Sequence, residues 1–326
     1  MGRIFTIIFS CQFLLLLSCS DSDNGEQPNA RNYRQDMRDF VKSISAYART
    51  TDPGFVIIPQ NGQELITHDS SSSGSPASDY LQAINGQARE DLLFGFDSDN
   101  VPTPPQETQN ITDYLNRAEE MGIQALVIDY CWDQAYVDSS YIRNNRENYI
   151  SFAASHRELD NIPTYPVNPY NMNSNDINSL QDAKNFLYLI NPDLYPSKDS
   201  LINALRAADF DLLILDLFYD DIQLTAQDIS SLKTKAGGGR RLVVAYMSIG
   251  EAEDYRYYWQ TSWYVNPPVW LLEENPDWPG NYKVEYWNLQ WQNIFCGNDS
   301  SYCRKILNSG FDGAYLDIID AFEYFE

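Results

Sequence analysis

Acidic residues stand at the ends of several apolar segments of this 326-residue sequence. Asp129 follows Ala-Leu-Val-Ile, Asp216 follows Leu-Leu-Ile-Leu, and Asp317 follows Ala-Tyr-Leu. A carboxylate in such a segment is costly to bury unless it is paired or reaches an open edge. If these acids meet at one place, they repel one another and raise the pKa of at least one of them.

Clustered carboxylates beside many aromatic residues indicate glycoside hydrolysis. That reaction needs one carboxylic acid to protonate the leaving oxygen, and a second carboxylate as nucleophile or as base for water. The chain has only two histidines and no Gly-x-Ser-x-Gly motif, which argues against a His-rich metal site and a serine hydrolase. We predict no cofactor; a carboxylate-bound Mg²⁺ or Ca²⁺ is the alternative.

Among the carboxylates near the ends of the apolar segments, we expect Asp216 and Glu253 to be the reacting pair, with the roles of acid and nucleophile left open. Glu251 is the alternative acid. Asp129 and Asp317 are expected to hold the sugar or to tune pKa values.

Other polar and aromatic side chains have expected supporting roles. Tyr246 can bond a carboxylate, and Arg256 can keep an acid ionised, although a structural salt bridge explains Arg256 equally well. Trp259 and Trp270 are candidate surfaces for stacking on sugar, with loop core as the alternative. Arg89, Glu90 and Asp91 either reach the same site or form plain surface charge.

The elements that must position these residues alternate between strand and helix. Apolar runs without polar alternation indicate strands buried on both faces, and their alternation with helical patterns predicts an α/β fold, a (β/α)₈ TIM barrel. The expected strands are 55–62, 125–132, 162–168, 186–192, 212–218, 241–253 and 310–320. The expected helices are 33–48, 108–122, 144–158, 197–208, 225–236 and 291–307.

Barrel enzymes carry their chemistry at the carboxyl ends of the strands, where the acids stand. The Trp- and Pro-rich residues 259–288 are expected to form a long loop over that end. Few residues follow Asp317, so either the eighth helix is short or the chain is incomplete at its C-terminus. An open doubly wound sheet is the alternative, but no Gly-x-Gly-x-x-Gly follows a strand.

Charge and the N-terminus bear on location and partners. With 22 basic and 46 acidic residues the net charge is −24, which disfavours nucleic acid as a partner. Residues 1–18 read as a signal peptide, and Leu16-Leu17-Ser18-Cys19 resembles a bacterial lipobox, which implies lipidation of Cys19. Residues 19–32 are then a disordered tether, and 33–326 the barrel domain. We expect an exported monomer, facing the periplasm or the cell surface, that contacts the membrane only through its anchor.

Two later motifs resemble a known family. The segment YMSIGEAEDYR, with Tyr246, Ser248, Gly250, Glu253, Asp254, Tyr255 and Arg256, and the segment GFDGAYLD at 310–317 are similar to glycoside hydrolase family 114. This is the TIM-barrel family of endo-α-1,4-polygalactosaminidases, also labelled cysteinyl-tRNA synthetase-like extracellular proteins. The resemblance covers about residues 33–326 and implies hydrolysis within an α-linked, galactosamine-rich polysaccharide.

A surface glycan-binding lipoprotein without turnover is the alternative from another class. Two carboxylates facing one cleft favour an enzyme, whereas acids each tied to an arginine or to the backbone favour a binder. Cys296 and Cys303 stand in a short polar loop, where a disulfide and two free thiols are both compatible with the sequence.

Overall fold

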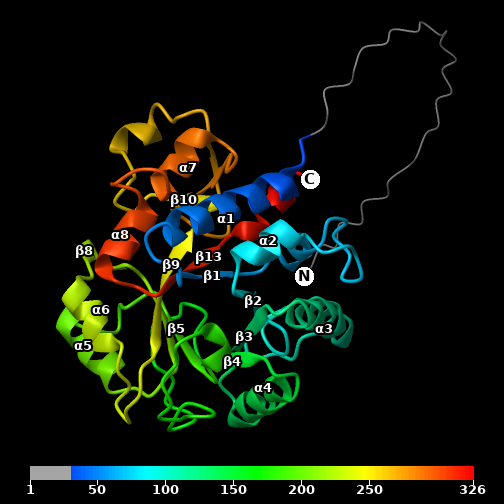
Figure 1. Ribbon diagram of the computed structural model, residues 1–326, viewed down its shortest axis with the longest axis vertical. Coiled ribbons are helices and arrows are strands. Elements are labelled where there is room, and N and C mark those ends of the chain that lie inside the picture. Colours follow the sequence, from blue (N-terminus) through cyan, green and yellow to red (C-terminus); the bar gives the residue numbers. More distant parts are fainter. Residues whose placement is uncertain (1–30) are drawn as a thin grey trace, which may run out of the picture. The chain divides into compact units, whose positions relative to one another are not determined.

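The computed structural model describes residues 31–326, in which eight strands follow one another around a ring. Helices lie around these strands (Figure 1). The predicted signal peptide, the lipidation site Cys19 and residues 19–30 of the predicted tether lie outside the described residues. The ring order is β1-β2-β3-β4-β5-β6-β9-β13. These strands are β1 (Val56–Pro59), β2 (Gly86–Glu90), β3 (Gln124–Tyr130), β4 (Ile150–Ala154), β5 (Phe186–Leu189), β6 (Leu212–Leu215), β9 (Leu242–Ser248) and β13 (Gly313–Asp317).

Hydrogen bonds join most of this ring. One parallel sheet has the order β1-β13-β9-β6-β5 and a second has the order β2-β3-β4. A bridge between Gln60 and Ala88, with a 2.9 Å bond from Asn61 N to Ala88 O, links β1 to β2. Strands β4 and β5 are adjacent without a ladder. The predicted (β/α)₈ architecture is therefore confirmed, with the hydrogen bonding between strands interrupted between β4 and β5.

Helices cover the outside of the ring. They are α2 (Ser78–Ala83), α3 (Pro105–Glu120), α4 (Gln134–Arg146), α5 (Lys198–Arg206), α6 (Ala226–Leu232), α7 (Leu289–Phe295) and α8 (Tyr302–Ser309). Between β4 and β5 the described chain has only the short 3-10 helix η2 (Leu180–Asp182). No helix of the described residues is both long and apolar enough to span a bilayer.

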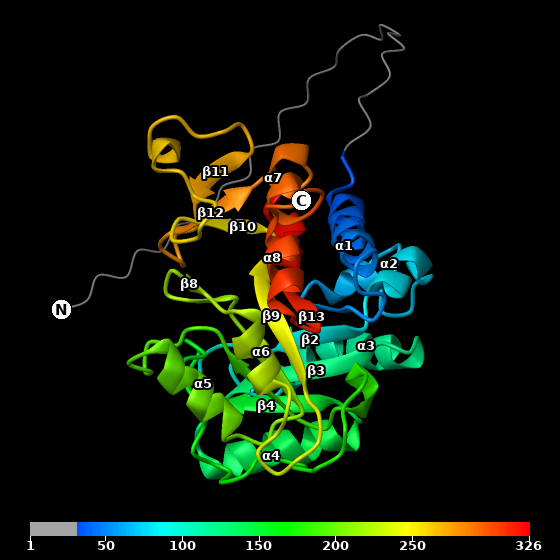
Figure 2. The same cartoon turned by 60° about the vertical axis from the view of Figure 1, so that its left-hand side comes forward.

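The helix position after the last strand is filled from the other end of the chain. Among residues 31–326, η4 (Ile319–Tyr324), a 3-10 helix, is the only helix that follows β13, whereas α1 (Tyr33–Arg49) lies between α2 and α8 (Figures 1 and 2). Its inner face buries Met37, Phe40 and Ile44, whose spacing of three and four residues makes one stripe of a helix. A helix that precedes β1 thus occupies the position expected for the helix after β13.

Three predicted elements are wrong. The expected helix 291–307 is two helices, α7 and α8, separated by residues 296–301. The expected helix 144–158 is instead the end of α4 and all of β4, separated by Asn148, whose left-handed backbone (φ 65°) ends the helix. The expected strand 162–168 is irregular, because Pro163 and Pro166 remove the backbone donors that a ladder needs. Strand β2 was not anticipated, because its sequence GQARE is mostly polar.

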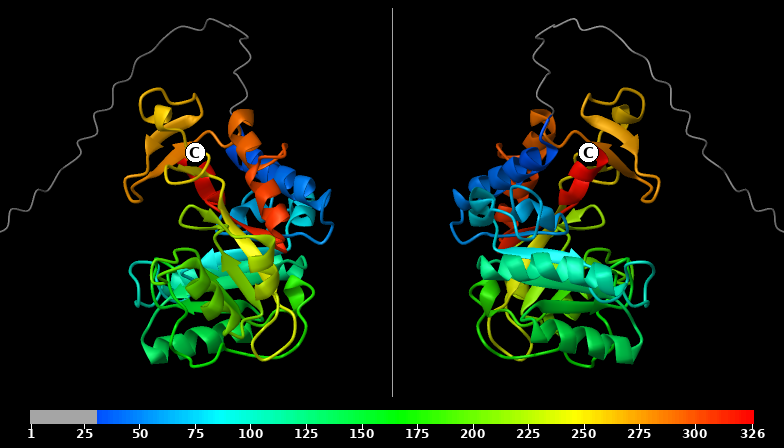
Figure 3. Two further views of the ribbon diagram at one scale, coloured as in Figure 1. Left: turned by 90° about the vertical axis from the view of Figure 1, so that its left-hand side faces the viewer. Right: turned by 90° about the vertical axis from the view of Figure 1, so that its right-hand side faces the viewer.

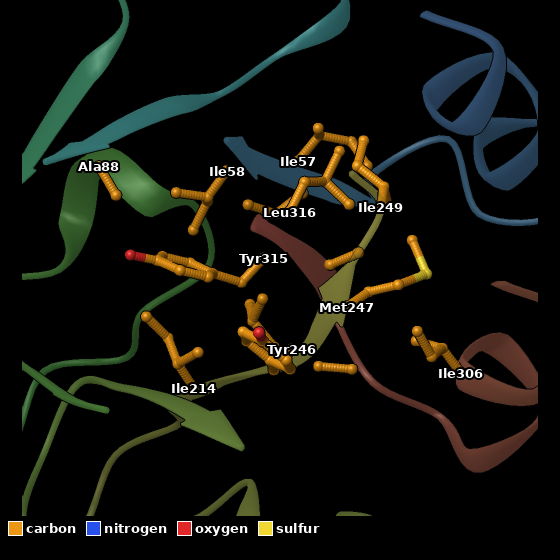
Figure 4. Packing of buried hydrophobic residues seen from close by; sticks show 14 of the residues in the cluster. Ile57, Ile58, Ala88, Ile214, Tyr246, Met247, Ile249, Ile306, Tyr315 and Leu316 are labelled. Atoms are coloured by element: carbon orange, nitrogen blue, oxygen red, sulfur yellow. The ribbon is translucent and has the colours of Figure 1, made fainter. Parts of the chain in front are cut away.

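Side chains alternate between the inside of the ring and the helical layer. Ile58, Ala88, Ile214, Tyr246 and Tyr315 pack together inside the ring (Figure 4). Within β3, residues 126, 128 and 130 belong to this inner core, whereas 125 and 127 pack in a second cluster with residues of α3 and α4. This period of two decides which strand residues reach the open end of the barrel.

The long segment after β9 forms a small sheet of its own. Strands β10 (Glu251–Glu253), β12 (Asn281–Val284) and β11 (Leu271–Glu274) pair antiparallel in that order, beyond the end of β9 (Figure 3). Gly250 connects β9 to this sheet, and a Cβ there would lie 2.0 Å from the carbonyl oxygen of Ile318. Only glycine allows this close passage past the end of β13.

Candidate active site

A cleft of about 420 Å³ opens at the carboxyl ends of the strands. Five residues predicted from the sequence line it: Asp216, Tyr246, Glu253, Arg256 and Asp317. They come from the ends of β6, β9, β10 and β13, which are neighbours in space although up to 101 positions separate them in the sequence. The structure thus brings together the two acids expected to react and three of their expected neighbours.

Asp216 and Glu253 are bound to one guanidinium, and we call these residues with Tyr255 the Arg256 cluster. Arg256 donates from Nη1 to Asp216 Oδ2 at 2.5 Å and from Nε to Glu253 Oε2 at 2.6 Å. The Tyr255 hydroxyl donates to the other oxygen of Glu253 at 2.7 Å. All three charged side chains are at most 9 % exposed, so the ion pairs are shielded from water.

Burial dominates the titration of Asp216. Desolvation raises the pKa of its carboxyl group, and the charge and hydrogen bond of Arg256 oppose that rise. Asp216 also accepts a 2.7 Å bond from the backbone N–H of Phe218. Burial and Arg256 thus act on the Asp216 carboxyl group in opposite directions, and the net shift of its pKa is upward.

Asp317 belongs to a second group, the Asp317 cluster, which also comprises Tyr246, Gln60 and Glu90. The Tyr246 hydroxyl donates to Asp317 Oδ2 at 2.8 Å, and Gln60 Nε2 donates to Oδ1 at 3.0 Å. None of the described cationic side chains bonds Asp317. Burial, reinforced by the nearby charge of Glu90, raises the pKa of Asp317 to about 8.

Glu90 reaches the cleft from the end of β2. Its two oxygens accept hydrogen bonds from the Tyr130 hydroxyl and from Asn61 Nδ2. Arg157 lies 3.8 Å from the centre of the Tyr130 ring. Of the three charged residues in Arg89-Glu90-Asp91, Glu90 alone lines this cleft, while Asp91 pairs with Arg157.

Asp129 does not line the cleft, which corrects the expectation that it holds the sugar. Its neighbour Tyr130 points into the ring, so Asp129 points into the helical layer. There it is fully buried and accepts bonds from the Ser140 hydroxyl at 2.6 Å and from Asn144 at 3.1 Å. Backbone N–H groups of Leu93 and Phe94 complete its partners. Its contacts are those of a residue that ties the strand to α4.

Glu251, the alternative acid, also lies outside the cleft lining, and its side chain is fully buried. It accepts hydrogen bonds from Asn275 Nδ2 at 2.8 Å, from the Tyr324 hydroxyl at 2.9 Å and from Asn281 Nδ2 at 3.3 Å. With its oxygens engaged and shielded, Glu251 has no path to a substrate in this cleft.

The predicted stacking residues Trp259 and Trp270 are packed among other rings and do not line the cleft. Trp259 lies 4.9 Å from the ring centre of Tyr282, and Trp270 lies 4.9 Å from that of Trp291. Trp270 is almost fully buried. The alternative interpretation, loop core, describes both residues.

Other residues of the cleft lining were not anticipated. Trp278 and Tyr255 are 56 % and 60 % exposed and line the cleft. The sequence does hold a signal for Trp278, because Asn-Pro-Asp-Trp-Pro-Gly is a turn, and a tryptophan at the tip of a turn is poorly placed for core packing. Gln60 and Tyr188 share the inward parity of Ile58 and Phe186, a pattern that also could have indicated them.

No cysteine of the described part of the chain lines this cleft. Cys131, Cys296 and Cys303 are free and buried, so the alternative of two free thiols in the 296–303 loop is the one observed. Among residues 31–326, no three histidine, cysteine or acidic side chains are grouped to hold a metal ion.

Three curated relatives share part of the chain, and each bears the name of an uncharacterized protein. The protein from Methanocaldococcus jannaschii is 42 % identical over 133 residues, 40 % of this chain and 36 % of the relative. That from Deinococcus radiodurans is 40 % identical over 122 residues, 37 % of each chain. That from Thermotoga maritima is 41 % identical over 131 residues, 40 % and 39 % of the two chains. The matches thus span less than two fifths of the relatives.

A family match covers the later half of the barrel. Residues 172–325 match Glycoside-hydrolase family GH114, a shorter range than the 33–326 expected from the two motifs. The matched range contains Asp216, Glu253, Arg256 and Asp317, whereas Gln60 and Glu90 precede it. Over residues 172–325, the chain is therefore similar to glycoside-hydrolase family GH114.

Proposed function

We propose that this protein is a glycoside hydrolase that cleaves an α-linked amino-sugar polysaccharide of the galactosaminan type. The observation that carries the proposal is the meeting of Asp216 and Glu253 in one cleft at the carboxyl ends of barrel strands. The GH114 match over the same residues supports the reaction class.

The two carboxyl groups have environments suited to different roles. Asp216, with its raised pKa, is the proposed acid: its proton passes to the glycosidic oxygen as the bond to the anomeric carbon breaks. Glu253 accepts donors at both oxygens, and is the proposed nucleophile or the base that takes a proton from water. Water supplies the hydroxyl group and the proton that the two products gain.

Charge supports the choice of an amino sugar. The chain carries a net charge of −24. Besides Asp216, Glu253 and Asp317, the cleft lining contains four more acidic residues: Glu90, Glu158, Asp320 and Glu323. A polymer with free amino groups is cationic and would be attracted to such a surface. We also propose export and anchoring through Cys19, on the strength of the sequence of residues 1–19.

The experiment incubates purified protein, residues 20–326, with de-N-acetylated α-1,4-galactosaminan and follows new reducing ends. Glu253→Gln and Asp216→Asn should each lower the rate at least about 10²-fold, the usual size of an acid or base contribution. Asp254→Asn is the matched control, because Asp254 adjoins Glu253 but bonds Tyr264 and does not line the cleft.

Release of no reducing ends by the unmodified protein would contradict the proposed activity on this polymer. Full activity of the Glu253→Gln protein would instead show that the reacting residues are misassigned. A control that loses as much activity as Glu253→Gln would point to general damage in this segment.

One observation favours a second candidate, a glycan-binding protein without turnover. Both proposed reacting carboxylates are paired with Arg256, the pattern expected of a binder. Retained affinity for the polymer with no product formed by the unmodified protein would support this candidate.

A further inference from the structure

Two exposed aromatic side chains line the cleft, Trp278 and Tyr255 of the Arg256 cluster. Trp278 occupies the turn between β11 and β12, and Tyr255 follows β10; both side chains are more than half exposed and both line the cleft. Exposing large aromatic rings to water in a cleft is unfavourable unless a ligand covers them. Rings of this kind pack on the apolar C–H faces of a pyranose.

The turn that carries Trp278 is defined by short bonds across the hairpin. Asn275 N donates to Asn281 O at 2.7 Å, and Asn281 N donates to Trp278 O at 3.0 Å. Gly280 has the left-handed backbone (φ 89°) that this turn requires, and a Cβ there would lie 2.9 Å from Asp254 Oδ1. Trp278 therefore projects from an ordered turn rather than from a loose loop.

Glu251 fixes this hairpin relative to the barrel. Its carboxylate accepts the side-chain amides of Asn275 and Asn281, which flank the turn, and the hydroxyl of Tyr324 from η4. Glu251 follows β9 by three residues, and η4 follows β13. One buried acid thus joins the turn to two strand ends of the ring, and a buried acceptor with three donors is costly to disturb.

We propose that Trp278 and Tyr255 form an aromatic clamp that stacks on a pyranose ring of the polysaccharide, and that Glu251 is the positioning residue that holds this clamp at the cleft. The inference rests on the proposed function for the identity of the ligand. It assigns to Glu251 a role different from that of the acid expected from the sequence.

The test measures binding rather than turnover, with Glu253→Gln as the parent protein so that the polymer stays intact. De-N-acetylated galactosaminan is the probe, with chitosan as a second amino-sugar polymer of different linkage. Trp278→Ala should weaken binding of the galactosaminan about tenfold, a typical size for the loss of one aromatic contact. Trp278→Phe, which keeps a ring, should stay within about threefold of the parent.

The matched control is Tyr264→Ala, which removes a half-exposed ring from the same subdomain but outside the cleft lining. It should leave the Kd within about twofold, as expected for a surface ring that contacts no ligand. A Kd for Trp278→Ala within twofold of the parent overturns the clamp, as does failure of the parent protein to bind either polymer.

Coupling between Glu251 and Trp278 tests the positioning role. Glu251→Gln should weaken binding about tenfold, because an amide cannot accept all three donors, and the double variant with Trp278→Ala should be no weaker than either single one. Additive losses would overturn the positioning role. If Glu251→Gln does not fold, Asn275→Ala, which removes one of the three bonds, takes its place in the same cycle.

Failure of the clamp and failure of the proposed function give different results. Binding that depends on Trp278, with no reducing ends released by the unmodified protein, keeps the clamp and rejects the hydrolase. Hydrolysis by the unmodified protein, together with binding that does not depend on Trp278, rejects the clamp and supports the hydrolase.

Discussion

The Arg256 cluster and the Asp317 cluster share one cleft but treat their carboxyl groups in opposite ways. In the first, one guanidinium bonds both acids at 2.5 and 2.6 Å. In the second, Asp317 has only a tyrosine hydroxyl, an amide and a backbone N–H as donors, with Glu90 nearby. Burial is similar, since Asp216 is 8 % and Asp317 is 9 % exposed.

The difference shows that the charged partner, and not burial alone, decides how far the pKa of a buried acid departs from its ordinary value. Burial raises the pKa of both acids, but Arg256 opposes the rise at Asp216, whereas Glu90 adds to it at Asp317. Asp317 therefore holds its proton at neutral pH, so the cleft contains at least one neutral carboxyl group.

The largest expected effect comes from removing the cation of the first cluster. Arg256→Met leaves two buried carboxylates without a counter-charge and should lower the free energy of unfolding by about 3–5 kcal/mol at pH 7. Urea unfolding at pH 7 and at pH 5 measures it. The loss should shrink at pH 5, where protonation of the unpaired acids relieves the repulsion.

Arg34→Ala provides the control, because Arg34 pairs with Glu326 across a partly exposed contact at 2.8 Å. A pair of that kind contributes at most about 1 kcal/mol. Equal losses for the two arginine variants would remove the distinction between the Arg256 cluster and a surface ion pair.

The Asp317 cluster should make the stability of the protein depend on pH. Asp317 has a pKa of about 8 in the folded protein and 3.8 ordinarily, so between these values the unfolded chain releases a proton that the folded chain keeps. Stability therefore falls as pH rises from about 4 to about 8. Asp317→Asn removes this contribution and should reduce the fall between pH 5 and pH 8 by at least about 1.4 kcal/mol, the equivalent of one pKa unit.

Urea unfolding of both proteins at the two pH values measures that difference. An identical pH dependence with and without Asp317 would mean that its carboxyl group titrates normally, and the contrast between the clusters would disappear.

The smallest effect is expected at the hydroxyl that supports Asp317. Tyr246→Phe removes the 2.8 Å bond to Asp317 Oδ2 and should cost about 1 kcal/mol of stability. The cost should be greater at pH 9 than at pH 6, because this bond favours the ionised form of Asp317 and lowers its pKa. An equal cost at the two pH values would indicate that Asp317 is already ionised at pH 6.

The chemistry of the site could be predicted in part. The acids after apolar runs, Tyr246 and Arg256 were found because parallel strands of a barrel end on one face. The same rule failed for Asp129, because a strand alternates its side chains and only the adjacent Tyr130 points inward. It failed for Glu251 because three donors from segments distant in sequence enclose its carboxylate.

By itself, the sequence determined the alternation of strand and helix, and with it the barrel, since unbroken Val, Ile and Leu runs have few other ways to be buried. It also determined the shared end at which the acids had to meet. Only the tertiary structure decided that α1 takes the position of the eighth helix, that one guanidinium joins Asp216 to Glu253, and that Trp278 rather than Trp259 faces the cleft. Those outcomes depend on contacts between residues far apart along the chain, which local patterns of hydrophobicity do not encode.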